Sequence, residues 1–412
     1  MGRRQVAVIG AGVSGLTAAY LLRWEHDVTL FEADDRLGGH AHTHDLGGLA
    51  VDSGFIVHNE RTYPFLLRLF AELGVATQAT EMSMSVRCEG CGLEYAGARK
   101  LPGLFARPRN AVDPRFLAML AQVPRFHRKA RALLAAGDDD MTLGEFSRGF
   151  STYFVRHFLV PVVSAVWSCG PERVADYPAR YLFVFLERHG MLSVQGSPTW
   201  RTVVGGSRSY VDKVAAALPA ARRGVPVRSV TRVAGGVEVR DEADFAQFFD
   251  AAVIATHADQ ALAIRPDASA AEKELLGAFG YSRNETLLHT DDAILPRHTN
   301  ARASWNYLLP ACDPGAGRPV VSYDMNRLQR LDTPTPHVVT LNPAGRVPED
   351  AVLARMDYAH PVYTAEAVAA QRRLPELSDA TVAYAGAYHG WGFHEDGCRS
   401  GVLAALSLGV VW

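Results

Sequence analysis

The chain is 412 residues long, with 48% apolar and 21% charged residues and a formal net charge of −2. This length exceeds one ordinary domain core and predicts two domains, or one large domain with an insertion. The near-neutral charge argues against a protein built mainly to bind nucleic acid or an anionic membrane, and no window holds the roughly 20 apolar residues of a membrane span. Only four of the 42 basic residues are lysines: Lys100, Lys129, Lys213 and Lys273.

Near the amino terminus a strand, a glycine-rich turn and a helix are predicted in direct succession. Residues 5–9 (QVAVI) are typical of a buried parallel strand. They run into the turn Gly10-Ala11-Gly12-Val13-Ser14-Gly15, and residues 16–24 favour a helix. A second strand over residues 28–31 ends in Glu32. This is the full strand–GxGxxG–helix–strand–acid pattern of a dinucleotide site.

Each part of this pattern has a physical reason. Gly10 permits the tight turn, Gly12 lets a pyrophosphate approach the backbone, and Gly15 lets helix and strand pack closely. The amino terminus of the helix offers free N–H groups and a positive dipole end to phosphates. Glu32 can accept hydrogen bonds from ribose hydroxyls, and its charge would repel a 2′-phosphate. The predicted cofactor-binding residues of this segment are Gly10, Gly12, Val13, Ser14, Gly15 and Glu32.

The next segment indicates which dinucleotide is bound. Glu32 is followed by Arg36-Leu37-Gly38-Gly39 and, after a histidine-rich stretch, by Val51-Asp52-Ser53-Gly54-Phe55-Ile56. Here the sequence resembles the flavin-containing amine oxidase superfamily, which carries E-x-x-x-R-x-G-G after the second strand and includes monoamine oxidases, phytoene desaturases and protoporphyrinogen oxidases. The resemblance implies FAD rather than NAD, with Arg36 and Gly39 at the pyrophosphate. The site residues that it adds are Arg36, Gly38, Gly39, His40 (where the family usually has Arg), Ser53, Gly54, Phe55 and Ile56.

Two groups of possible metal ligands follow. His40, His42 and His44 alternate and would share one face of a strand, but no carboxylate or cysteine cluster joins them, so hydrogen bonding beside the flavin or at the surface is favoured over zinc. Cys88 and Cys91 form a CxxC next to two glycines, which is typical of a hairpin turn. A zinc site would normally need a second pair, and the other cysteines lie singly and far apart: Cys169, Cys312 and Cys398. We therefore predict no metal, and five cysteines over this length favour a reducing, cytoplasmic location.

Two later segments match further parts of the superfamily's FAD domain. A helix over residues 210–218 is followed by a hairpin over 226–240 and a buried strand over 250–256. The resemblance implies that the backbone of Val227 meets the adenine. Near the carboxyl terminus, a strand over 382–386 and a glycine–aromatic step precede a final helix over 402–410. In the superfamily the amino terminus of that helix points at the flavin, which favours the anionic reduced ring. The residues implied here are Gly386, Phe393, His394 and Glu395.

These observations predict an α/β fold of the amine oxidase-like type. A discontinuous Rossmann-like FAD-binding domain, marked by GxGxxG, would comprise residues 1–79, 199–261 and 376–412. A mixed α+β substrate domain would comprise residues 80–198 and 262–375, with helices mainly in 112–136 and 142–190 and strands near 281–289 and 303–308. The polar and aromatic residues considered for the substrate side are Trp167, His189, Trp200, His289, Trp305, Asn306, Tyr307, Asn326, His389 and Trp391.

The resemblance runs nearly end to end with a bacterial branch described as amine oxidase-like or NAD/FAD-binding oxidoreductases, through phrases such as GFIVHNERTYP and YHGWGFHEDGCRSG. It implies an enzyme with non-covalent FAD that takes a hydride from an apolar or lipid-like small molecule onto flavin N5, giving desaturation or double-bond isomerisation. An amine oxidase releasing hydrogen peroxide is the first alternative. Amine oxidases usually keep a lysine near the flavin, but Asn284–Leu288 has none and Lys273 comes too early. The second alternative is a non-catalytic flavin-binding partner protein. Catalytic residues and oligomeric state stay open.

Overall fold

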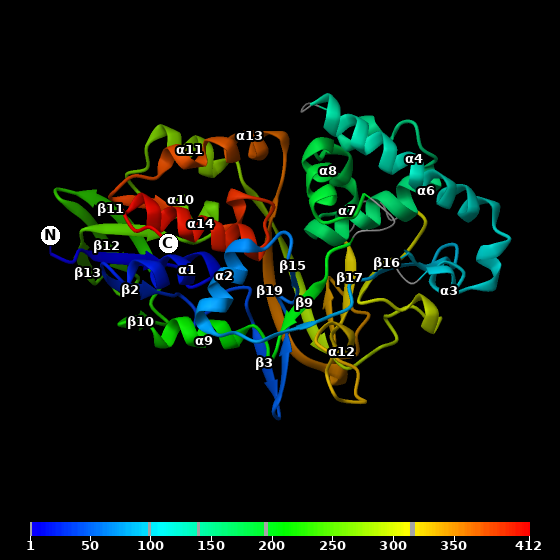
Figure 1. The fold of residues 1–412 in the computed structure, drawn as a ribbon, viewed down its shortest axis with the longest axis horizontal. Coiled ribbons are helices and arrows are strands. Elements are labelled where there is room, and N and C mark those ends of the chain that lie inside the picture. Colours follow the sequence, from blue (N-terminus) through cyan, green and yellow to red (C-terminus); the bar gives the residue numbers. More distant parts are fainter. Residues whose placement is uncertain (1, 98–99, 138–140, 193–196, 314–317) are drawn as a thin grey trace.

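Figure 1 shows the fold in a computed structural model of the chain, which describes residues 2–97, 100–137, 141–192, 197–313 and 318–412. The described helices and strands form two regions, one at each end of the long axis, with the long strands β15 and β19 running between them. None of the described helices combines the length and apolar character of a membrane-spanning helix.

The first region is built on a five-stranded parallel sheet. Its strands come from parts of the chain that are far apart in sequence, and each pairs in parallel with its neighbours. Apolar residues such as Val6 and Val253 are fully buried, as expected for a sheet covered on both faces. The order is β10 (Ala220–Arg222), β2 (Asp27–Phe31), β1 (Gln5–Ile9), β14 (Ala251–Ile254) and β20 (Val382–Tyr384). The strands predicted at residues 5–9, 28–31, 250–256 and 382–386 are confirmed.

Smaller sheets and helices cover this core. The predicted hairpin at residues 226–240 is confirmed as part of an antiparallel sheet of β11 (Val227–Val233), β12 (Gly236–Asp241) and β13 (Ala246–Phe249). The other small sheets are β3 (Thr43–Leu46) with β4 (Leu49–Asp52), and β5 (His58–Asn59) with β9 (Trp200–Val203) and β6 (Thr77–Ala79). The helices here are α1 (Val13–Leu22), α2 (Pro64–Leu73), α9 (Arg208–Ala216), α10 (Ala258–Ala263), α11 (Ala270–Gly277), α13 (Ala365–Arg373) and α14 (His394–Ser407).

The second region contains a seven-stranded mixed sheet and a helical layer. Its strands are antiparallel except for the parallel pair β16–β7. The order is β19 (Val352–Val362), β15 (Gly280–His289), β18 (Val338–Leu341), β17 (Val320–Asp324), β16 (Trp305–Leu309), β7 (Met84–Cys88) and β8 (Glu94–Ala96), with the short helix α12 (Met325–Leu328) after β17. The helical layer comprises α4 (Pro114–Ala136), α5 (Leu143–Ser147), α6 (Thr152–Phe154), α7 (Val160–Trp167) and α8 (Ala179–Arg188), and α4, α6, α7 and α8 are labelled at the upper right of Figure 1. The short helix α3 (Lys100–Leu104) lies below them at the right. The mainly helical character predicted for residues 112–136 and 142–190 is confirmed. The domain boundaries proposed from the sequence stay predictions.

Helix α14 packs against α1 and α2 through glycines and one buried carboxylate. A Cβ on Gly401 would lie 2.3 Å from the carbonyl oxygen of Ser14, so only glycine allows this approach. The Glu395 carboxylate accepts hydrogen bonds from the backbone N–H groups of Phe65 (3.0 Å) and Leu66 (2.9 Å), in the first turn of α2. The carboxylate thus satisfies two N–H groups that have no partner within their own helix.

Glu395 makes the stability of the fold depend on pH. Burial raises the pKa of this carboxyl to about 7, so the folded chain holds the proton more tightly than the unfolded chain does. The stabilisation of the folded state that results from this raised pKa is fully present below about pH 4, and it is lost as pH rises through about 7. We expect Glu395→Gln to remove this part of the pH dependence, up to roughly 3 kcal/mol between pH 4.5 and 8. Urea unfolding at several pH values measures it.

The control for this prediction is Glu242→Gln, at an exposed glutamate whose side chain makes no hydrogen bond or ion pair within the described residues. It should leave the pH profile of stability unchanged. A Glu395→Gln protein that loses stability between pH 4.5 and 8 as steeply as the wild type would contradict the assignment.

Candidate functional site

The glycine-rich turn after β1 is shaped by two close contacts and one open position. Gly10 has φ +97°, and a Cβ there would lie 2.7 Å from the Ala255 carbonyl oxygen. A Cβ on Gly15 would lie 1.9 Å from the carbonyl oxygen of Gly10. A Cβ on Gly12 would meet no described atom within 4 Å. Protein packing therefore explains Gly10 and Gly15 but leaves Gly12 facing open space, as close approach of a ligand would require.

A second glycine turn lies beside the first. The Gly38 N–H donates to the Ala11 carbonyl (2.8 Å), and a Cβ on Gly39 would lie 3.1 Å from the Gly12 Cα. The Arg36 guanidinium donates to the Gly39 carbonyl (2.7 Å), which places a positive charge next to both turns. The structure thus brings together the GxGxxG turn and the Arg36-to-Gly39 segment, as the resemblance implied.

Glu32 stands at the same edge, at the end of β2. Its carboxylate accepts hydrogen bonds from the N–H groups of Ala11 (2.7 Å) and Asp34 (3.0 Å). The Glu32 carbonyl accepts from the Val225 N–H (2.9 Å), so the chain leading into β11 passes beside Glu32. Val227, two residues further on, is thereby held near the end of β2.

The segment from Ser53 to Ile56 packs on the residues after Gly39. A Cβ on Gly54 would lie 2.0 Å from the His40 carbonyl oxygen, which also accepts from the Phe55 N–H (2.7 Å). The Ser53 hydroxyl lies 2.8 Å from the Tyr358 hydroxyl. The Ile56 carbonyl accepts from the Thr202 hydroxyl (2.9 Å). The segment therefore runs between the glycine turns and β19.

The carboxyl-terminal residues reach this edge from β20 and α14. Gly386 follows β20, and its N–H donates to the Ser400 hydroxyl (2.9 Å). The His394 ring stacks on Phe55 with 3.8 Å between ring centroids, and its Nε2 lies 2.7 Å from the Tyr210 hydroxyl. Phe393 directly precedes α14. Glu395 differs from these residues because its carboxylate is committed to the first turn of α2.

These segments converge because the carboxyl ends of parallel strands share one edge of a sheet. Gly10, Glu32 and Gly386 each follow such a strand, and the amino termini of α1 and α14 lie close together there: a Cβ on Gly397 would be 2.6 Å from a Val13 methyl group. Two positive helix ends and several backbone N–H groups thus face one place, which is an arrangement that attracts phosphate.

Histidines gather on the side of this edge that faces β19. The His40 ring lies 5.0 Å from Tyr358, 5.6 Å from His360 and 6.1 Å from His257. Burial lowers the pKa of His360 to about 4 and that of His40 well below its usual range, so both imidazoles are neutral at pH 7. Within the described residues, the buried Nε2 of His40 has no hydrogen-bond partner.

The alternation of His40, His42 and His44 does not create a metal site in the described part of the chain. The His42 Nδ1 lies 3.0 Å from the Tyr358 hydroxyl, and the His44 Nε2 lies 2.9 Å from the Ser53 hydroxyl. The preference for hydrogen bonding over zinc is consistent with these contacts.

An aromatic wall of six side chains stands between the helical layer and the start of α14. We define it as Trp167, Tyr181, Phe185, Tyr363, Trp391 and Phe393, whose neighbouring rings lie 4.9–6.3 Å apart. The Trp167 indole donates to the Trp391 carbonyl (3.0 Å), and the Tyr181 hydroxyl donates to the Gly390 carbonyl (2.8 Å). Sequence reasoning pointed to Trp167, Trp391 and Phe393 but missed Tyr181, Phe185 and Tyr363, because a helical pattern does not distinguish core aromatics from site aromatics.

The remaining substrate-side candidates separate into two groups. His189 lies 6.1 Å from both Trp200 and Phe393, next to the aromatic wall. His389 directly follows Tyr388 and has a buried, unpartnered Nε2 among the described residues. The others lie on strands of the seven-stranded sheet or on α12 beside it: His289, Trp305, Asn306, Tyr307 and Asn326.

Strand β15 contains Asn284–Leu288, the stretch in which the resemblance to amine oxidases would imply a lysine, and β15 has none. Asn284 is buried; its Nδ2 lies 3.0 Å from the His360 Nδ1, and its Oδ1 accepts from Asn342 (2.8 Å). Its neighbours on the same face are the buried residues Thr286 and Leu288. Lys273 lies on α11, before β15 in the chain.

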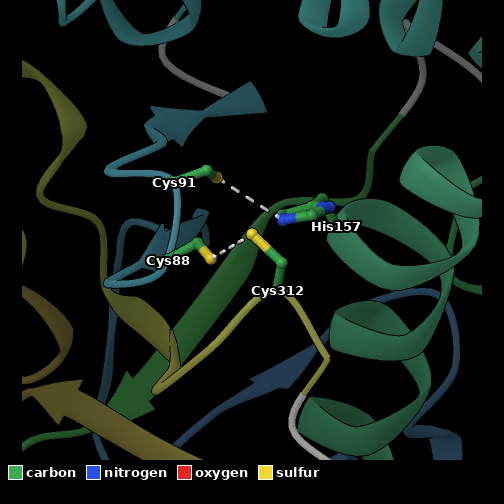
Figure 2. Close-up of side chains that lie close together, drawn as sticks. All are labelled: Cys88, Cys91, His157 and Cys312. Atoms are coloured by element: carbon green, nitrogen blue, oxygen red, sulfur yellow. Dashed lines mark hydrogen bonds between the residues drawn. The ribbon is translucent and has the colours of Figure 1, made fainter.

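Cys88 ends β7 and Cys91 lies in the connection to β8, which pairs with β7 as the predicted hairpin requires. They are not alone, because the fold brings His157 and Cys312 beside them (Figure 2). Sequence spacing missed this cluster, since three separate segments contribute to it.

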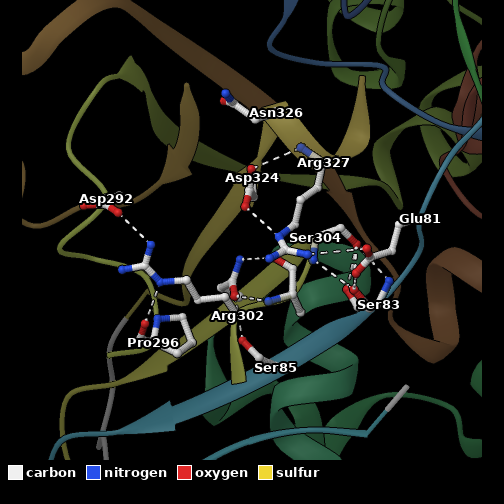
Figure 3. Close-up of polar contacts among 12 residues, drawn as sticks. Glu81, Ser83, Ser85, Asp292, Pro296, Arg302, Ser304, Asp324, Asn326 and Arg327 are labelled. Atoms are coloured by element: carbon white, nitrogen blue, oxygen red, sulfur yellow. Dashed lines mark hydrogen bonds and ion pairs between the residues drawn. The ribbon is translucent and has the colours of Figure 1, made fainter. Parts of the chain in front are cut away.

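A polar network supports the first residues of β7 and β16 (Figure 3). Arg327 bridges Asp324 (3.0 Å) and Glu81 (3.4 Å), and the Ser83 hydroxyl donates to Glu81 (2.6 Å). The Ser304 N–H donates to the Ser83 hydroxyl (3.0 Å). Because these charges are paired with one another, the network is structural support and not a candidate site.

Comparison with known proteins places this geometry in a family. A family model described as flavin containing amine oxidoreductase matches residues 13–343. A Mycobacterium tuberculosis protein whose name assigns it to the flavin-containing monoamine oxidases is 30% identical over 250 residues, 58% of this chain and 53% of that protein. Protoporphyrinogen oxidase 2 of Arabidopsis thaliana is 52% identical over 183 residues, 42% and 34% of the two chains. The chain spans about half the length of the first of these curated relatives, and less of the second.

Solved structures share the fold over nearly the whole chain. Cyclohexylamine oxidase from Brevibacterium oxydans superposes with a TM-score of 0.70 at 18% identity, over 98% of both chains. A fatty acid isomerase from P. acnes superposes with a TM-score of 0.65 at 17% identity, over 97% of both. At this identity the likeness concerns the fold alone, and it confirms the predicted amine oxidase-like α/β class. The family model covers more than half of the chain, so the chain belongs to the flavin-containing amine oxidoreductase family.

Proposed function

We propose that this protein is an FAD-dependent oxidoreductase that removes a hydride from an apolar or partly apolar small molecule. The product is a desaturated compound, or an isomer when the hydride returns at another carbon. Family membership supports a flavin cofactor. The choice of FAD and the class of substrate rest on the residues described above.

The edge of the parallel sheet fits a non-covalently bound FAD. Gly12 leaves the backbone open, Glu32 can receive the ribose hydroxyls, and Arg36 carries a positive charge beside the glycine turns. The unpartnered His40 Nε2 supports a ligand here, because buried polar atoms nearly always have a partner. The Cys398 thiol lies 3.5 Å from the Thr17 hydroxyl, between α1 and α14, so it is occupied with packing. The proposed cofactor residues are those identified in the sequence, with Glu395 acting through α2.

The aromatic wall is the observation that carries the substrate class. The indole N–H of Trp167 and the hydroxyl of Tyr181 donate to backbone carbonyls, so the part of these side chains that remains for contact with a ligand is apolar ring surface. Aromatic surfaces bind apolar groups and exclude water. When bound, FAD supplies a two-electron acceptor at N5. The wall orients the substrate against it and keeps water away.

Desaturation also releases a proton. Burial lowers the pKa of His389 to about 3, so its imidazole is neutral at pH 7 and too weak a base to be our choice of proton acceptor. Its buried Nε2 has no partner within the described residues, and we infer that this nitrogen hydrogen-bonds a ligand instead.

Amine oxidation is the second candidate, because a curated relative is named as a monoamine oxidase. The absence of a lysine from β15 argues against it. Dehydrogenation of an apolar substrate needs no such lysine, so the first candidate is preferred.

The cofactor assignment predicts different outcomes at two neighbouring glycines. Gly12→Ala should preserve the fold, since its Cβ meets no described atom within 4 Å, yet FAD affinity should fall roughly tenfold or more because the methyl group obstructs the pyrophosphate. Gly15→Ala should destabilise the apoprotein by about 1–3 kcal/mol, since its Cβ overlaps the Gly10 carbonyl. FAD titration and thermal unfolding of the apoprotein measure these effects.

The control is Gly97→Ala, at an exposed glycine whose added Cβ also meets no described atom within 4 Å. It should retain both FAD and stability. If Gly12→Ala binds FAD as tightly as this control, the pyrophosphate does not lie at the glycine turn.

The substrate class is tested by mixing the purified, FAD-loaded protein anaerobically with panels of fatty acids, terpenoids, porphyrinogens and amines. We expect an apolar member to bleach the absorbance near about 450 nm, or to be isomerised without net bleaching, as mass spectrometry of the products would show. Amines should do neither.

Two outcomes would overturn the proposal. Bleaching by simple amines alone, with stoichiometric peroxide after oxygen is admitted, would establish amine oxidation. A protein that holds FAD but neither transforms nor is reduced by any member of the panels would be a non-catalytic flavin-binding partner.

A further inference from the structure

Four metal-ligating side chains from three separate segments meet at the end of β7 (Figure 2). One donor atom from each of Cys88, Cys91, His157 and Cys312 lies within 4.8 Å of the others. The Cys88 and Cys312 sulfurs are 3.8 Å apart, and the Cys91 sulfur is 3.6 Å from the His157 Nε2. In tetrahedral zinc sites with bonds of about 2.3 Å to sulfur and about 2.0 Å to nitrogen, ligand atoms stand about 3.5–3.8 Å apart. We propose that these four residues form a structural Cys₃His zinc site.

The histidine is already oriented for this role. Its Nδ1 lies 3.1 Å from the Tyr153 carbonyl oxygen, to which it can donate only as the Nδ1–H tautomer. The lone pair of Nε2 then faces the sulfurs, and zinc-binding histidines are commonly held by such a second hydrogen bond. The ring also stacks on Tyr153 with 4.1 Å between centroids. His157 occupies a π-helical turn, Val155–Leu159, a local irregularity often found at functional sites.

The backbone allows the CxxC loop to approach Cys312 closely. A Cβ on Gly90 would lie 2.7 Å from the Cys312 backbone nitrogen, so only glycine fits between the two segments. Gly92 has φ +71° and turns the chain directly after Cys91. The Glu89 N–H donates to the Leu309 carbonyl (2.9 Å), which fixes the loop to the end of β16. Tight packing of the backbone therefore holds the CxxC loop and Cys312 next to each other.

Zinc explains this cluster better than a disulfide does. A Cys88–Cys312 bond would require the sulfurs to move from 3.8 Å to about 2.05 Å and an oxidant to take two electrons. It would also leave Cys91 and His157 without a role. Zinc uses all four ligands, and its binding moves no electrons: three thiol protons pass to solvent as three sulfur–zinc bonds form.

The ion would fasten the helical layer to the seven-stranded sheet. Cys88 ends β7, Cys312 follows β16, and His157 lies just before α7 in the helical layer. A structural zinc site of this kind contributes directly to folding. Zinc binding at this cluster requires neither FAD nor substrate, because none of the four ligands belongs to the proposed cofactor residues or to the aromatic wall.

Metal analysis of the full-length protein tests the inference. We expect protein purified in reducing buffer without chelators, then supplied with zinc and desalted, to hold about one zinc ion per chain by inductively coupled plasma mass spectrometry. Substitution of cobalt should give the visible absorption of tetrahedral thiolate coordination. The Cys91→Ser and Cys312→Ser proteins should each retain at most roughly a tenth of the zinc that the wild type holds.

The matched control is Cys169→Ala, at a buried cysteine outside the cluster, which should keep its zinc. The wild-type measurement stands even if a ligand variant fails to fold. Wild-type protein without zinc, zinc retained in full by both ligand variants, or a Cys88–Cys312 disulfide in the native protein would each overturn the inference.

Discussion

Close backbone approach at one edge of the parallel sheet is the constraint on which the rest of the structure depends. A side chain on Gly15 would overlap the Gly10 carbonyl, and one on Gly401 would overlap the Ser14 carbonyl. Because both positions are glycine, α1 packs on the sheet, α14 packs on α1, and two helix amino termini reach the same edge. Glu395 then lies close enough to satisfy the first turn of α2. A phosphate group at this edge would be held by backbone N–H groups and helix dipoles. Side chains further from the edge, such as those of the aromatic wall, are then available to determine the substrate.

The parts of the fold that sequence reasoning predicted are those with local signals. The GxGxxG turn, the acid after the second strand and the Arg36-to-Gly39 segment each place a physical requirement on a few consecutive residues. The structure brings these segments together because parallel strands align their carboxyl ends. The hairpin at residues 226–240 was equally predictable, since its turn and its alternating strands are contiguous in the chain.

Contacts between distant segments were not predictable in the same way. Glu395 was expected at the flavin, yet its carboxylate caps α2, because the approach of Phe65 and Leu66 depends on the packing of whole helices. The aromatic wall combines residues of α7 and α8 with Tyr363, directly after β19, and with Trp391 and Phe393, just before α14; the motif phrase at the carboxyl terminus marks only the last two. The CxxC motif was expected to form a turn only, since Cys312 and His157 lie far from it in sequence. Its partners become visible only when β7 pairs with β16 and the helical layer closes over both.

Helix α7 connects the cysteine cluster to the aromatic wall. The turn that contains His157 continues directly into α7, and α7 carries Trp167 near its end. Trp167 in turn holds the backbone of Trp391 just before α14, at the edge where the helix dipoles converge. A metal bound to His157 would therefore anchor the base of the helix that positions the wall. On the sheet, β7 and β15 are separated by β16, β17 and β18, so at about 4.8 Å between neighbouring strands β7 and β15 lie roughly 19 Å apart. The element that joins the cluster to the aromatic wall is therefore α7, and a metal at His157 would act on the wall as a restraint on how α7 is held.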